Sequence, residues 1–152
     1  MVVTAPTERD RRRRFSVHPA LATAAMLAIA IHFWGLYRPI GPPVPQWFPG
    51  ADKLEHVVGF AVPLFLLLLS CRSFLRARGR ATSRALVVVL TGLFAAHAVI
   101  SELAQYEFYV SRTGDPADVA ADWVGCAAAF VGYALIELHS KPASARSRRD
   151  RT

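Results

Sequence analysis

Cysteine and recognisable catalytic motifs are both scarce in this chain of 152 residues. The two cysteines, Cys71 and Cys126, lie in different apolar blocks. If each block is a helix rising about 1.5 Å per residue, their depths differ by about 15 Å, beyond the roughly 7 Å that a disulfide bridges. No HExxH zinc motif occurs, and no serine or cysteine stands beside a base at the spacing of a nucleophilic site. These absences exclude a disulfide between the two cysteines and weigh against an enzyme.

Apolar sequence is abundant, and it is gathered into blocks. Hydrophobic residues make up 53% of the chain, and its mean hydropathy is +0.29. The four blocks are Ala20–Leu36, Leu54–Cys71, Ala85–Ala104 and Val119–Leu138. A helix of about 17–25 apolar residues crosses a hydrocarbon core about 30 Å thick. No block alternates polar and apolar residues as the strands of a barrel do. The sequence therefore predicts an all-α fold, a bundle of four transmembrane helices.

The basic residues are divided unevenly between the ends and loops of these blocks. Of the 18, 15 lie before the first block, between the second and third, or after the fourth. Only Arg38, Lys53 and Arg112 lie in the other two loops. Lysine and arginine accumulate on the cytoplasmic side of membrane proteins, so we expect both termini in the cytoplasm and the helices in a bacterial cytoplasmic (inner) membrane. Because the arginines flank apolar spans, nucleic acid is not an expected partner.

One membrane domain with two polar ends is the expected organisation. Residues 1–17 form a basic segment predicted to be disordered, residues 18–139 the four-helix transmembrane domain, and residues 140–152 a flexible basic tail. The run Arg12-Arg13-Arg14-Phe15 partly matches a twin-arginine export signal. No small-x-small cleavage site precedes the proline-rich loop that follows the first block, so we expect the first helix to be uncleaved.

Polar residues from three of the blocks are expected at one membrane face. The second and fourth helices start at the outer face and the third ends there, so three sets share that leaflet: Asp52, Lys53 and His56; Glu102 and Gln105; Arg112, Asp118 and Asp122. The two acids of the fourth helix continue at helical spacing into a stripe of small residues, Gly125, Ala129 and Gly132. Small residues let membrane helices pack closely, so these acids should point into the bundle. Ionisable groups inside a membrane usually mark a functional site.

A structural role is the alternative for single members of this set. Asp52 or Asp118 would serve as a helix cap. Glu102 needs another explanation, because it lies near the carboxyl end of its helix, where the helix dipole disfavours a carboxylate. Its compensating partner would be Lys53, Arg112 or His56. Two other histidines, His32 and His97, have no partner by spacing and are expected to be packed helix residues.

In order along the chain, these polar residues form three motifs: Asp52-Lys53-x-x-His56, Ser101-Glu102-x-x-Gln105 and Arg112-x5-Asp118-x3-Asp122-x2-Gly125. Together they resemble the VanZ-like family, over residues 50–132. That resemblance implies a small bacterial polytopic membrane protein, and the founding member of the family is associated with resistance to the glycopeptide teicoplanin. The family's polar set carries over to Asp52, Lys53, His56, Glu102, Gln105, Arg112, Asp118 and Gly125. The chain departs from the pattern at Asp122, where the family usually has asparagine, and the extra acid favours a protonated carboxyl or a bound cation.

Two functions fit these observations. The first is a non-enzymatic envelope protein whose outward-facing cluster binds an envelope lipid or its headgroup and affects susceptibility to glycopeptides or lipoglycopeptides. Its partners would be membrane lipids, a lipid-linked envelope precursor or a lipoglycopeptide, and it would need no cofactor. Lys53, Arg112 and His56 would then attract an anionic headgroup.

The second function is a membrane-embedded enzyme acting on a lipid-linked envelope intermediate. It would use a divalent cation, the one cofactor that the donor set suits, held by the polar cluster: His56, Asp52, Glu102, Asp118 and Asp122. A small transporter fits less well, because the inner halves of the spans offer no continuing polar path.

Overall fold

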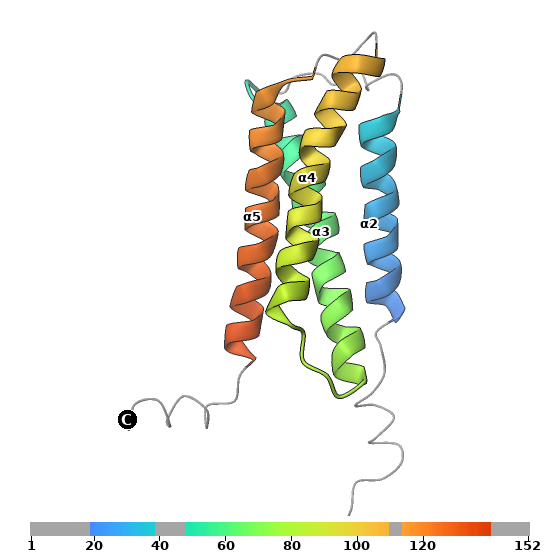
Figure 1. The fold of residues 1–152 in the computed structure, drawn as a ribbon, viewed down its shortest axis with the longest axis vertical. Coiled ribbons are helices and arrows are strands. Elements are labelled where there is room, and N and C mark those ends of the chain that lie inside the picture. Colours follow the sequence, from blue (N-terminus) through green and yellow to red (C-terminus); the bar gives the residue numbers. More distant parts are fainter. Residues whose placement is uncertain (1–18, 39–47, 110–113, 141–152) are drawn as a thin grey trace, which may run out of the picture.

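The computed structural model describes residues 19–38, 48–109 and 114–140, which form four helices and, within those ranges, no strand. The helices are α2 (Pro19–Tyr37), α3 (Ala51–Ala77), α4 (Arg84–Phe108) and α5 (Pro116–His139). They stand side by side in one bundle, with α2 and α5 on either flank of α3 and α4 (Figure 1). Each of the four predicted spans lies inside one of these helices. The prediction of an all-α bundle of four membrane-spanning helices is therefore confirmed.

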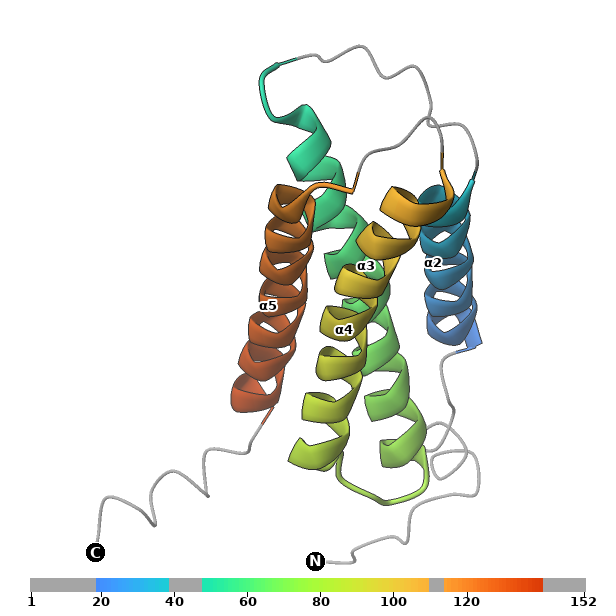
Figure 2. The same cartoon turned by 45° about the horizontal axis from the view of Figure 1, so that its top comes forward.

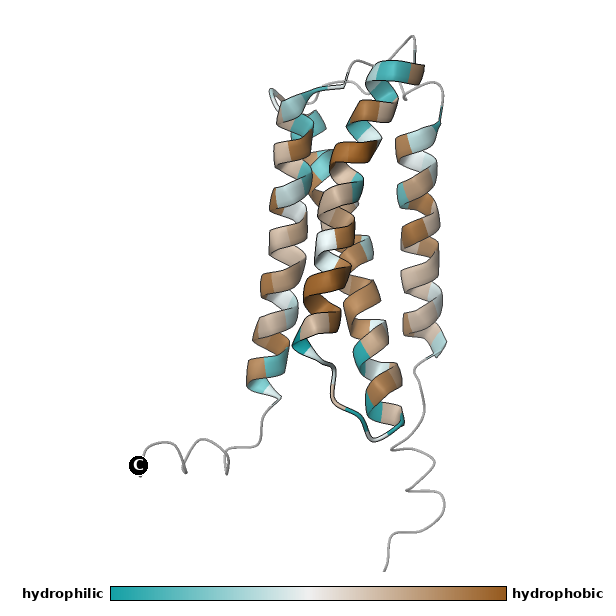
Figure 3. Cartoon of the chain, viewed as in Figure 1, coloured by the Kyte–Doolittle hydropathy of each residue, from teal (hydrophilic) through white to brown (hydrophobic). Residues whose placement is uncertain are grey.

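Each helix is long and apolar enough to cross a membrane. Hydrophobic residues run along the middle of the bundle, and hydrophilic ones gather towards the helix ends (Figure 3). Only 17–28% of the most apolar part of each helix is buried against the other helices, and large side chains such as Met26, Leu93 and Leu103 are exposed. An apolar surface of this extent is expected to face lipid. The chain is thus a multi-pass membrane protein. Its predicted polar ends, residues 1–17 and 140–152, lie outside the described residues except for Ser140.

The helix starts differ from the predicted caps. The residue before α3 is Gly50, in the left-handed region at φ 86°, which glycine adopts at no steric cost. At α5 the cap is Asp115, whose carboxylate accepts a hydrogen bond from the backbone N–H of Ala117 at 2.8 Å. Asp52 and Asp118 instead lie in the first turns of α3 and α5. These two acids therefore do not cap their helices.

The closest packing in the bundle is between α3 and α5, which share the most extensive contact and start at the same end (Figure 2). Gly125 of α5 is buried, and a Cβ added there would clash with the Val57 carbonyl oxygen and lie 3.1 Å from the Ala61 nitrogen. One turn further on, Ala129 is also buried, and the next small residue, Gly132, faces the Phe65 ring. The predicted small-residue stripe of the fourth helix thus lies against α3.

An ionic contact joins α3 and α5 again at their other ends. The Arg72 guanidinium donates to the Glu137 carboxylate, and Arg76 approaches the same carboxylate at 3.4 Å. Both arginines were expected in a loop. They lie on α3 because that helix continues past Cys71 to Ala77.

A separate polar cluster ties α2 to α4. His32 Nε2 lies 3.4 Å from His97 Nδ1, and the Tyr37 hydroxyl lies 3.0 Å from His97 Nε2. The Phe60 ring packs edge-on against His32, with centroids 4.6 Å apart. The expectation that the two histidines are packed helix residues is confirmed. Their hydrogen-bond partners come from different helices, where sequence spacing gives no signal.

The close approach at Gly125 generates a stability prediction. Gly125→Ala should lower the free energy of unfolding by about 1–3 kcal/mol, the usual cost of overpacking, because its methyl group would meet backbone atoms that cannot move aside. Gly92→Ala is the matched control, since a Cβ on Gly92 of α4 meets nothing within 4 Å. Thermal unfolding in detergent would measure both variants. Equal melting temperatures for the two would contradict the close α3–α5 packing.

Candidate functional site

The starts of α3 and α5 and the end of α4 lie at the same end of the bundle (Figure 2). Charged side chains from these three helices meet there. We call this group the end cluster; its members are Asp52, Lys53, His56, Glu102, Asp115, Asp118 and Asp122. The structure brings together six of the eight predicted binding residues and adds Asp115. Of the other two, Gln105 lies elsewhere and Arg112 lies outside the described residues.

Lys53 is the cation that holds together one part of the end cluster, which we call the outer layer: Lys53, Asp52, Asp115 and Asp118. Its ammonium group lies 2.5 Å from Asp118, 2.8 Å from Asp115 and 3.1 Å from Asp52. The three carboxylates belong to the starts of α3 and α5, so Lys53 joins these two helix ends. The expectation that Lys53 attracts an anionic headgroup loses its basis, because three carboxylates already compensate its charge.

Asp115 was missed as a site residue, because its position before Pro116 reads only as a helix start. Its carboxylate both caps α5 and receives Lys53. The hydrogen bond from Lys53 is the main reason why the pKa of Asp115 lies below its usual value. A lowered pKa stabilises the fold at neutral pH, and that contribution is lost only as the pH falls through the lowered value.

The other three members of the end cluster, His56, Glu102 and Asp122, form a second group, which we call the deep layer. His56 Nδ1 lies 2.9 Å from Asp122 Oδ1, within hydrogen-bond distance, and His56 Nε2 lies 3.6 Å from Asp118. Asp122 has no exposed surface at all. Asp122 is therefore the most buried acid of the cluster.

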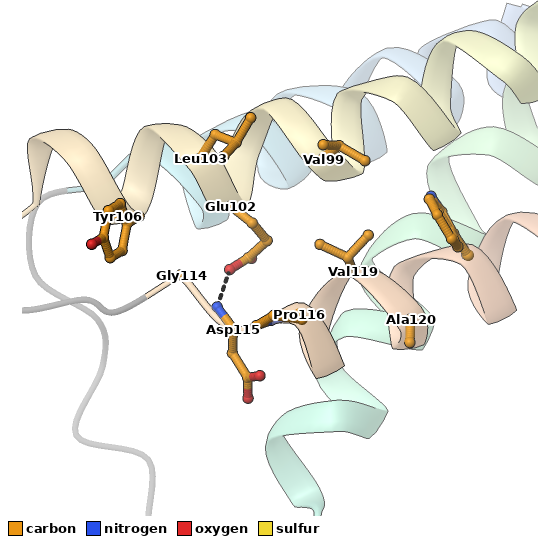
Figure 4. Close-up of a pocket in the computed structure, with 10 residues that line it drawn as sticks. Val99, Glu102, Leu103, Tyr106, Gly114, Asp115, Pro116, Val119 and Ala120 are labelled. Carbon is orange, nitrogen blue, oxygen red and sulfur yellow. Dashed lines mark hydrogen bonds between the residues drawn. The ribbon is translucent and has the colours of Figure 1, made fainter.

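Glu102 reaches the cluster from α4. Its side chain is 4% exposed, and its Oε2 accepts a hydrogen bond from the backbone N–H of Asp115 at 3.0 Å (Figure 4). Of the predicted partners, Lys53 pairs with other carboxylates, whereas His56 is a close neighbour. His56, Glu102 and Asp122 each offer one donor atom, and these atoms lie within 4.8 Å of one another. These three are the residues best placed to hold a metal ion.

Gln105 has its hydrogen-bond partner on α2 and none in the end cluster, among the residues that the structure describes. Its side-chain amide donates to the Leu36 carbonyl oxygen of α2 at 3.4 Å, and the side chain is buried. This residue, predicted to bind a ligand, therefore contacts the backbone of a neighbouring helix.

A cavity of about 490 Å³ lies between α4 and α5, beside the cluster. Its walls are almost entirely apolar and include Val99 and Leu103 of α4 and Val119 and Ala120 of α5 (Figure 4). Glu102 and Asp115 of the end cluster are also among the lining residues. This cavity could not be predicted from the sequence, because its walls have the same residue types as ordinary lipid-facing positions. It offers an apolar chain a place to lie next to charged groups.

The Lys53–Asp118 pair should be energetically coupled. Lys53→Met alone leaves three carboxylates facing one another without a cation, so adding Asp118→Asn should restore part of the lost stability. A double-mutant cycle measured by thermal or denaturant unfolding should give a coupling energy of roughly 0.5–3 kcal/mol. The control cycle pairs Lys53→Met with Glu107→Gln, an exposed acid of α4, and should be additive. Additivity in both cycles would contradict an energetic interaction between Lys53 and Asp118.

The chain was also compared with known proteins. No family model, curated protein or solved structure matches it.

Proposed function

We propose that this protein binds an envelope lipid in the cavity between α4 and α5, with the lipid headgroup beside the end cluster. The observation that supports this proposal is the cavity itself, whose lining combines apolar walls with Glu102 and Asp115, two residues of the end cluster. The proposal includes a bacterial inner membrane as the location, cytoplasmic termini, and the VanZ-like character suggested by the three motifs.

The size and chemistry of the cavity suit part of a lipid. Small-molecule sites usually enclose about 300–1,000 Å³ and are mostly apolar with a few placed polar groups. The walls formed by Val99, Leu103 and Val119 would take an acyl or isoprenoid chain. The polar end would then lie against the headgroup at the membrane face.

The end cluster favours a headgroup that donates hydrogen bonds. Among the described residues it holds five carboxyl groups against Lys53 and His56, and Lys53 is engaged by three of them. A phosphate group alone would meet like charge there, whereas hydroxyl, amide or amine groups would find acceptors. The sugar of a lipid-linked envelope precursor offers such groups. A change in glycopeptide or lipoglycopeptide susceptibility would be the consequence in the cell.

A metal-dependent enzyme acting on a lipid-linked intermediate is the second candidate. The observation favouring it is the convergence of His56, Glu102 and Asp122. Loss of catalytic turnover of such a lipid on chelation would separate this candidate from simple binding.

The proposed orientation can be tested with single cysteines in a variant that lacks Cys71 and Cys126. Phe48→Cys lies at the end of the bundle that carries the cluster, and Arg80→Cys in the turn between α3 and α4. In spheroplasts, a membrane-impermeant maleimide should label Phe48→Cys directly but Arg80→Cys only after permeabilisation. The reverse pattern would overturn the orientation drawn from the arginine distribution.

Lipid binding can be tested by filling the cavity. Ala120→Phe places a ring among the lining residues, whereas Ala128→Phe places one on an exposed part of α5 outside the lining. Native mass spectrometry of protein extracted with its lipids should show one retained lipid in wild type and Ala128→Phe. Ala120→Phe should reduce its occupancy at least tenfold. Equal retention in all three proteins would contradict the proposed site.

A further inference from the structure

Two buried carboxylate oxygens lie unpaired in the deep layer of the end cluster. Within the part of the chain that the structure describes, Glu102 Oε1 and Asp122 Oδ2 have no hydrogen-bond partner, although both atoms are shielded from solvent. Their side chains are 4% and 0% exposed. An unsatisfied buried charged oxygen is costly. The other oxygen of each carboxylate already has a partner: Glu102 Oε2 accepts a hydrogen bond from the Asp115 backbone N–H, and Asp122 Oδ1 contacts His56 Nδ1.

We propose that His56, Glu102 and Asp122 form a binding site for one divalent transition-metal ion. One donor atom from each of these residues lies within 4.8 Å of the other two. Ligands held about 2.0–2.2 Å from a zinc ion are at most about 4.4 Å apart, so small side-chain rotations would close the set around an ion. The ion would neutralise the two buried carboxylates and give their free oxygens a partner.

The donor set selects the class of cation. An imidazole nitrogen with two carboxylates suits Zn²⁺ or Mn²⁺. Calcium prefers six to eight oxygen ligands, and magnesium prefers an octahedral shell of oxygens and water. Lys53 already pairs with the acids of the outer layer, Asp52, Asp115 and Asp118. The deep layer is therefore the part of the cluster that has no lysine or arginine among its described members.

The three ligands come from three different helices, α3, α4 and α5. An ion held by them would join α4 to the α3–α5 pair at the end of the bundle that borders the cavity. Binding should therefore also stabilise the fold, since an ion that binds only the folded chain shifts unfolding by mass action. This inference does not depend on a lipid occupying the cavity.

The test uses the full chain in detergent, without a histidine tag and after treatment with a chelator. Calorimetric titration with ZnCl₂ and with MnCl₂ should show one saturable ion per chain for at least one of them, binding at least tenfold tighter than Ca²⁺ or Mg²⁺. Glu102→Gln and Asp122→Asn should each weaken it at least tenfold. The matched controls, Glu107→Gln and Glu55→Gln, change exposed acids outside the end cluster and should stay within about threefold of wild type.

A second readout guards against variants that fail to fold. The same ion should raise the melting temperature of the wild-type protein, and Co²⁺ in its place should give visible absorption bands that mixed nitrogen and oxygen ligands produce. No saturable binding by wild type would overturn the site. Equal weakening by the control variants, or equally tight Ca²⁺ binding, would also overturn it, because the exposed acids would then be the ligands. If the wild-type protein binds the ion but retains no lipid in native mass spectrometry, only the lipid proposal is contradicted.

Discussion

The close approach of α3 and α5 at Gly125 is the constraint on which the rest of the structure depends. Because the two helices run in the same direction, residues that face each other keep nearly the same sequence separation: 65 for Lys53 with Asp118, 66 for His56 with Asp122, and 65 for Arg72 with Glu137. The absence of a side chain at Gly125 lets the backbones meet between these pairs. In a membrane, where apolar side chains gain little by leaving lipid, such close packing and polar contacts hold helices together. The end cluster is therefore a product of the same interface.

The end cluster has two layers with different electrostatics. In the outer layer the charges are paired, since Lys53 bridges the starts of α3 and α5 through three carboxylates. The deep layer contains two carboxylates and one imidazole, with an oxygen left over on each acid. Asp122 creates this difference: an asparagine in its place would remove one buried charge. Asp122 is thus a position at which a bound cation would neutralise a fully buried charge.

The cavity adds an apolar neighbour to this charged end. Glu102 links the two, because its side chain lines the cavity and also belongs to the deep layer. An occupant of the cavity and an ion in the deep layer would therefore lie against the same residue. This arrangement would let binding at one place influence binding at the other, since each ligand changes the electrostatic surroundings of Glu102.

The sequence by itself determined the four helices and grouped most of the cluster, because hydrocarbon thickness dictates helix length and helix direction decides which ends share a leaflet. The small residues following Asp122 also indicated which face of the fourth helix would be buried. Only the tertiary structure decided the pairings: Lys53 with three acids, His32 with His97, and Gln105 with the Leu36 carbonyl. Sequence spacing relates residues within one helix, whereas these partners depend on how neighbouring helices are rotated and offset. The cavity between α4 and α5 was undetectable for the same reason, since apolar residues that line a cavity have the same sequence pattern as those that face lipid.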